Sequence, residues 1–162
     1  MQELGGNKVD CSDVIKHILV SLVDVASSKT STAYARTTLK ILLRKLERDY
    51  DILRYIMIED EIENNMDAIS VMTDVDSIDS QNVGRTIQDI IDLYKKELGE
   101  KAGYFFIREF RYVLGDEYLS IIKHMGVDLR LSELKDELYG WEIDKYKIKD
   151  HKDANIAYLE KK

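Results

Sequence analysis

The stretch that decides the fold class is SQNVGRTIQDIIDLYKKEL, residues 80–98. Its apolar residues recur at the three- and four-residue spacing that marks one face of an α-helix. They are Val83, Ile87, Ile90, Ile91, Tyr94 and Leu98. Gly99 follows, and glycine commonly ends a helix because it adopts the left-handed conformation without strain. The stretch therefore predicts a long amphipathic helix that buries one face in a mainly α protein.

Two further helices are predicted on the N-terminal side. Ser12 is placed to cap a helix whose apolar stripe is Val14, Ile15, Ile18, Leu19, Leu22 and Val23. A polar break at 27–32 then precedes a second helix. We expect its inward residues to be Tyr34, Ala35, Leu39, Leu42, Leu43, Leu46 and Tyr50, and its outer face to carry Arg36, Lys40, Arg44 and Arg48.

Residues 52–75 allow two interpretations. Ile52 to Ile58 and Ala68 to Met72 are short runs rich in β-branched and apolar residues, separated by Asn64 and Asn65. Such runs favour two short strands in a hairpin. A continued helix remains the alternative, because periodicity does not distinguish strand from helix in so short a run.

The helix predicted over 100–114 is apolar on two sides. Phe105 and Tyr112 share one face, whereas Phe106, Phe110 and Val113 share another. We therefore expect this helix to be the central one. Shorter helices follow at 118–125 and from Ser132. Glycines where helices could stop are Gly84, Gly99, Gly115, Gly126 and Gly140.

The predicted architecture is a mainly α bundle of five or six helices, with one small β-hairpin if residues 52–75 are extended. A chain of 162 residues is long enough to form one domain around a single core. We expect residues 1–162 to form that domain. Residues 141–162 are predicted to be a tail that docks on the bundle or on a partner.

The composition of the chain indicates its cellular compartment and whether it enters a membrane. We expect no secretory signal, because the first ten residues are polar, and no membrane span, because no apolar run approaches the roughly 20 residues that a span needs. A single cysteine, Cys11, excludes an internal disulfide and a cysteine-cluster metal site. We expect a cytoplasmic protein that does not enter a membrane.

The charge of the chain is uneven. The formal net charge is -7, and no Lys or Arg lies between Tyr55 and Gly84. The acidic residues of that segment are Glu59, Asp60, Glu61, Glu63, Asp67, Asp74, Asp76 and Asp79. We expect the basic face of the second helix to pair with this acidic segment. An acidic chain lacks the basic footprint of duplex binding, so no nucleic-acid partner is expected, with RNA binding by the basic face as the competing idea.

Catalytic and metal chemistry find little support in the motifs. A di-iron bundle needs Glu three residues before His, but Val14, Ile121 and Ile148 occupy those positions. No phosphate-binding glycine loop or nucleophile elbow occurs. The acidic residues after Met72 do not follow the calcium-loop pattern. We expect no metal, no cofactor and no catalytic residue, and we favour a protein that is not an enzyme.

One candidate site remains, on the helix at 100–114. Tyr104, Arg108 and Arg111 share a face, and we expect these arginines to pair with Asp89 or Asp92. The functional alternative is an anion anchor in an aromatic pocket. The residues predicted to bind a ligand are Tyr104, Phe105, Arg108, Arg111 and His124, and those predicted to form an interface are Phe105, Tyr112 and Trp141.

A resemblance adds to this interpretation. Residues 83–129, VGRTIQDIIDLYKKELGEKAGYFFIREFRYVLGDEYLSIIKHMGVDL, resemble uncharacterised helical proteins of archaea. The resemblance implies a small archaeal helical protein and no functional residues. From the residues themselves we predict a non-enzymatic interaction or regulatory domain that forms a homodimer, with another protein as a further partner. The alternative is a small-ligand-binding protein or an enzyme that uses the aromatic and arginine pocket.

Overall fold

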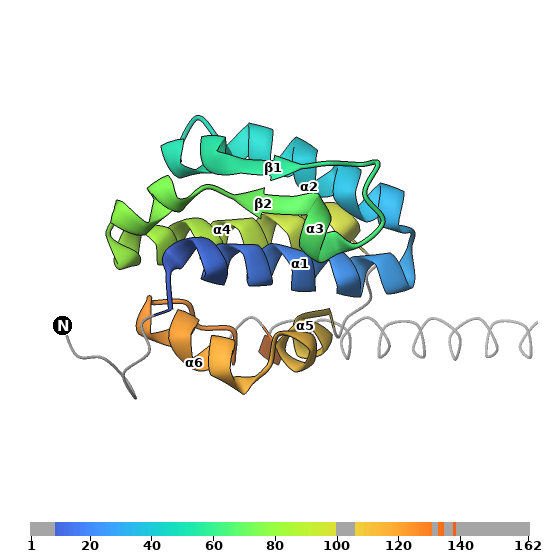
Figure 1. The fold of residues 1–162 in the computed structure, drawn as a ribbon. Coiled ribbons are helices and arrows are strands. Elements are labelled where there is room, and N and C mark those ends of the chain that lie inside the picture. The colour runs from blue at the N-terminus through green and yellow to red at the C-terminus, as the bar shows by residue number, and fades with distance from the viewer. Residues whose placement is uncertain (1–8, 100–105, 131–132, 135–137, 139–162) are drawn as a thin grey trace, which may run out of the picture.

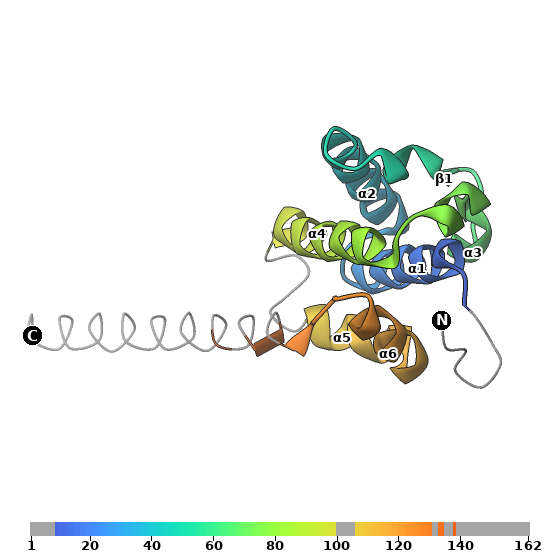
Figure 2. The same ribbon diagram turned by 90° about the vertical axis from the view of Figure 1, so that its left-hand side faces the viewer.

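The computed structural model describes residues 9–99, 106–130, 133–134 and 138. Within these residues the chain is mainly α, with six α-helices and one small antiparallel sheet, which confirms the predicted fold class. The elements lie in three layers (Figure 1, Figure 2). The layers are α2 (Thr32–Leu46) with the sheet, α1 (Cys11–Lys29) with α4 (Ser80–Leu98), and α5 (Phe106–Leu114) with α6 (Asp116–His124).

Helix α1 is the central helix. It packs against α2, α4, α5, α6 and the sheet, and Figure 1 shows it between the upper and lower layers. Its fully buried residues include Ile15, Leu19 and Leu22. The prediction that the helix at 100–114 is central is wrong, because α1 has apolar residues on more of its circumference: Val20 and Val25 are buried as well as the predicted stripe.

The start of α1 is capped from a distant segment. Asp10 is the N-cap residue and its side chain makes no capping bond. Instead the Asp76 carboxylate accepts hydrogen bonds from the Ser12 amide at 2.8 Å and from the Ser12 hydroxyl at 3.2 Å. The expectation that Ser12 caps the helix is therefore corrected: Ser12 lies inside the first turn, and a carboxylate from elsewhere satisfies its amide.

Helix α4 has the predicted inward face, with every residue of its apolar stripe buried. On α2 the prediction holds for Ala35, Leu39, Leu42 and Leu43, but it is wrong for Tyr34, which is exposed. Ser31 caps α2 by accepting a hydrogen bond from the Tyr34 amide at 3.1 Å. The buried Tyr94 of α4 donates its hydroxyl to the carbonyl of Ala35 at 3.0 Å, which satisfies a polar group that burial would otherwise leave unpaired. Burial raises the pKa of the Tyr94 hydroxyl.

Residues 52–75 form the hairpin rather than a continued helix. Strand β1 (Ile56–Ile58) pairs antiparallel with β2 (Ile69–Val71), with Met57 opposite Ser70. Short helical turns flank the strands: η2 (Asp51–Tyr55), α3 (Asn65–Ala68) and η3 (Thr73–Ser77). The side chains of Ile56 and Ile58 pack on the core, whereas Met57 is exposed.

Arg36 of α2 fastens the loop between the strands. The side chain is only 3% exposed. It donates to the carbonyls of Asp60, Ile62 and Glu63 at 3.2, 2.6 and 2.9 Å, and to the Asn65 side chain at 2.9 Å. The sequence placed Arg36 on the outer face of this helix, and that expectation is wrong, because the acidic loop folds over the guanidinium.

One carboxylate of the acidic segment forms an ion pair with a side chain of α2. Lys40 forms an ion pair with Asp60, which agrees in part with the predicted pairing of the basic face and the acidic segment. Arg36 uses main-chain oxygens of that segment instead of its carboxylates.

Glycine positions separate into two kinds. Gly99, Gly115 and Gly126 have positive φ of 56°, 89° and 92° and lie at helix ends, as predicted. Gly84 lies inside α4 and ends no helix, so its prediction as a stop is wrong. The backbone of α4 approaches Met125 there, and a Cβ on Gly84 would stand 1.9 Å from the Met125 carbonyl oxygen.

Candidate interaction surface

Of the apolar surfaces on α5 and α6, the outward face of α5 is the most exposed. Phe106, Ile107 and Phe110 bury the inner face of α5 in the core. Tyr112 is 88% exposed and Val113 is 47% exposed. The sequence grouped Val113 with the buried stripe, which is wrong, because Ile107 rather than Val113 completes the inner face.

A hollow of about 440 Å³ lies beside this face, between α1 and α5. We call it the α1–α5 hollow. Its lining residues are Asp24, Val25, Ser28, Arg108, Glu109, Tyr112 and Val113. Lys29 and Glu109 form an ion pair of 2.9 Å between the two helices. The apolar part of the surface is therefore bordered by charges of both signs.

Arg108 and Arg111 are brought together by one carboxylate. Arg108 lies 3.4 Å from Glu133, and Arg111 also forms an ion pair with Glu133, which is largely buried. The sequence named Asp89 and Asp92 as partners and missed Glu133. The Asp89 carboxylate accepts a hydrogen bond from Tyr50, and Asp92 accepts one from Gln88. Glu133 gave no signal in the sequence, because the 22 and 25 residues between partners exceed any helical spacing.

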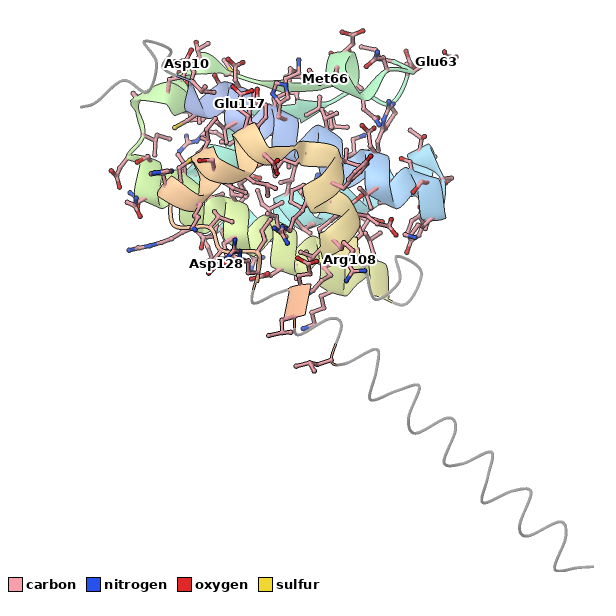
Figure 3. The ribbon with its side chains drawn as sticks, turned by 90° about the horizontal axis from the view of Figure 1, so that it is seen from below. Asp10, Glu63, Met66, Arg108, Glu117 and Asp128 are labelled. Atoms are coloured by element: carbon pink, nitrogen blue, oxygen red, sulfur yellow. The ribbon has the colours of Figure 1, made fainter. Side chains whose placement is uncertain are left out.

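The remaining predicted ligand residues do not join this pair. His124 lies on α6, where its Nδ1 is 2.7 Å from the carbonyl of Ser120, and it does not line the α1–α5 hollow. Tyr104, Phe105 and Trp141 lie outside the described residues, so their predicted roles stay predictions. Figure 3 shows Arg108 and Asp128 along one edge of the lower surface, with Glu63 and Met66 along the opposite edge.

An aromatic contact joins α1 to α6. The rings of His17 and Tyr118 stack at 4.3 Å, and the Tyr118 hydroxyl lies 3.3 Å from His17 Nε2. Burial, with Asp13 and Glu117 nearby, raises the pKa of Tyr118. The tyrosine is therefore neutral at physiological pH and acts as a packing and hydrogen-bonding group.

The described part of the chain has neither a metal-ligand cluster nor a membrane-spanning helix. No group of three or more His, Cys, Asp or Glu side chains there is placed to hold a metal ion. None of the helices described is both long enough and apolar enough to cross a membrane. No protein-family model, curated protein or solved structure matches the chain significantly. The resemblance of residues 83–129 to archaeal helical proteins stays a prediction.

Proposed function

We propose that this chain is a non-enzymatic interaction domain that self-associates through the outer face of α5. The single observation behind the proposal is the 88% exposure of Tyr112 next to the α1–α5 hollow. Tyrosine is enriched at the centre of protein interfaces, because its ring buries a large area and its hydroxyl finds a polar partner. Because Tyr112 is so exposed, covering its ring would remove a large apolar area from water.

The charges around the hollow suit a second copy of the same chain. In a two-fold dimer each patch meets itself, so the patch must be self-complementary. Arg108 and Glu109 are neighbours on α5, and both line the hollow. Antiparallel packing of two α5 helices would bring Arg108 and Glu109 of each copy near those of the other, so that unlike charges meet beside their partners Glu133 and Lys29 in the same chain. Tyr112 would then enter the opposite hollow.

The runner-up function is a ligand held in the α1–α5 hollow beside Arg108, which shares its Glu133 partner with Arg111. The volume is compatible with a small molecule. The contact of both guanidiniums with Glu133 counts against an anion anchor, because a carboxylate of the protein already neutralises part of their charge. We therefore favour the protein interface over the ligand site.

Sedimentation of the full chain over a wide concentration range tests the proposal. Self-association predicts a monomer–dimer equilibrium that shifts with concentration. A sedimentation coefficient of the monomer at every concentration up to millimolar would overturn it. In that case the predicted tail at 141–162 becomes the cover for Tyr112, and native mass spectrometry would reveal a retained ligand if the runner-up holds.

A further inference from the structure

A second groove lies on the opposite side of the molecule, between α2 and β1. It has a volume of about 380 Å³. Figure 2 shows α2 and β1 in the layer farthest from α5 and α6. The lining residues are Lys40, Leu43, Arg44, Glu47, Leu53, Arg54, Ile56, Met57 and Ile58. We call it the α2–β1 groove, and the self-association proposed above does not use it.

One wall of the groove is a strand edge. The Met72 amide donates to the Tyr55 carbonyl, and the Glu59 amide donates to the Ala68 carbonyl, both at 2.9 Å. Antiparallel strands alternate between residues that bond their neighbour and residues that face away. Ile56 and Ile58 therefore direct their main-chain groups away from β2.

The outer edge of β1 retains main-chain bonding capacity. The Ile56 amide is used, because it donates to the Leu53 carbonyl. The Ile56 carbonyl and the amide and carbonyl of Ile58 have no hydrogen-bond partner among the residues that the structure describes. An edge of this kind is a template on which an extended peptide adds as a further strand.

The rest of the groove has an apolar floor and a charged rim. Leu43 and Leu53 are 7% and 4% exposed and form the floor. The lining carries more positive than negative side chains: Lys40, Arg44 and Arg54 against Glu47. Lys40 and Arg54 pair with Asp60 and Asp51, whereas Arg44 has no ion pair within the described residues. Met57, 56% exposed, adds an apolar surface on the outer side of the strand.

We infer that the α2–β1 groove binds an extended acidic peptide, which adds to β1 as an antiparallel third strand. In an antiparallel pair, residues bonded directly opposite one another place their side chains on the same face. Peptide residues opposite Ile56 and Ile58 therefore face α2, where Arg44, which has no ion pair within the described residues, favours a carboxylate. The alternate peptide residues lie beside Met57, which favours apolar side chains. The matching sequence is an alternation of acidic and apolar residues.

The experiment measures fluorescence anisotropy with a labelled Glu-Val-Glu-Val-Glu peptide and the full-length protein. We expect saturable binding, no binding of the Lys-Val-Lys-Val-Lys peptide, and about tenfold weaker binding to Arg44→Glu, since reversing a rim charge has an effect of that order. Lys123→Glu on α6 is the matched charge reversal far from the groove, and its affinity should stay unchanged. Equal loss in both variants would overturn the inference.

Strand addition is separated from simple charge attraction by N-methylated peptides. Methylation of the glutamate amides should abolish binding, because those amides face β1. Methylation of the valine amides should leave affinity intact, because those amides face solvent. Amide resonances of Ile56 to Ile58 should move on titration. Insensitivity to methylation, shifts confined to other residues, or tighter binding of a single-stranded oligonucleotide than of the acidic peptide would each overturn the inference.

Discussion

The backbone of α4 at Gly84 touches the carbonyl of Met125, which closes α6 against α4. An added Cβ would stand 1.9 Å from that oxygen and 2.8 Å from the carbonyl carbon. Real Cβ contacts are never so short, and the obstructing atoms belong to the backbone, which cannot rotate aside. The position therefore requires glycine for a packing reason and not for a turn.

Gly84→Ala should destabilise the protein by about 1–3 kcal/mol, the usual cost of forcing extra volume into a packed contact. A loss of stability would be informative, because alanine is intrinsically favoured over glycine in a helix by about 1 kcal/mol. Helix propensity alone would therefore make Gly84→Ala more stable. Urea denaturation measures the difference. Asn82→Ala, an exposed change two residues earlier in α4, is the control and should be nearly neutral. A stabilised Gly84→Ala protein would contradict the close contact.

Arg36→Met should cost about 2–4 kcal/mol, because the loop carbonyls lose a buried charged donor. Arg36→Lys should recover only part of the loss, since one ammonium cannot reproduce the guanidinium fork. The acceptors are neutral carbonyls, so the loss should change little with salt. Denaturation at low and high ionic strength measures this.

Lys40→Met provides the comparison for Arg36. Its ion pair with Asp60 is exposed, so the change should cost only about 0.2–1 kcal/mol and less at high salt. Equal losses in the Arg36 and Lys40 variants would show that the main-chain contacts of Arg36 contribute little.

Asp76→Ala should weaken the start of α1 by about 1 kcal/mol, a typical value for the loss of a capping oxygen. Asp74→Ala removes an exposed carboxylate of the same turn, one that makes no hydrogen bond or ion pair within the described residues, and it should have little effect. Hydrogen exchange at the Ser12 amide gives the direct measurement. Unchanged protection of that amide in Asp76→Ala would show that another group satisfies it.

Tyr50 predicts a pH dependence in the alkaline range. The hydrogen bond to the Asp89 carboxylate is the main cause that raises the pKa of Tyr50 to about 12, above the usual value of about 10. A raised pKa means that the folded state holds the proton more tightly than the unfolded state. The stabilisation is complete below pH 10 and is lost as the pH rises from 10 to 12.

Tyr50→Phe isolates this contribution. The difference in unfolding free energy between wild type and Tyr50→Phe should be constant up to about pH 10 and should then shrink. Denaturant titrations of both proteins at several alkaline pH values measure it. A difference that is the same at pH 8 and at pH 11 would contradict the Tyr50–Asp89 bond.

Tyr112→Glu should shift the dimer to monomer, with the dissociation constant raised at least about 100-fold if Tyr112 is central to the interface. Met66→Glu is the control, because Met66 is also exposed and lies along the opposite edge (Figure 3). Analytical ultracentrifugation reads both. If truncation before Trp141 causes aggregation while Tyr112→Glu leaves the association state unchanged, the tail and not a second copy covers α5.

The features predicted correctly from the sequence are those with a local period. The apolar residues of 80–98 and of 14–23 face the core because helical spacing alone places them on one side. The hairpin could not be distinguished from a continued helix, since runs of five to seven residues satisfy either period. The prediction of Gly84 as a helix stop is wrong, because helix stops and close contacts between helices both select glycine.

The remaining features depend on contacts between distant segments. The cap from Asp76 to Ser12 spans 64 residues, and nothing in either stretch names the other. Arg36 shares its four-residue spacing with Lys40, Arg44 and Arg48, so only the folded loop distinguishes it from its exposed neighbours. On α5 the sequence correctly placed Tyr112 away from the buried Phe106 and Phe110, and this made Tyr112 a candidate for an interface. It could not show that Glu133 would reach Arg108 and Arg111.

The way Arg36 holds its loop affects how this protein can diverge. The guanidinium recognises carbonyl oxygens of Asp60, Ile62 and Glu63, and every amino acid supplies that oxygen. The contacts with Arg36 therefore fix the backbone of the loop without using the side chains of these three residues. Relatives could exchange the acidic residues of this loop for other residues and keep the same backbone path, provided that Arg36 and the amide of Asn65 are retained. The loop is a position where surface chemistry can evolve independently of the fold.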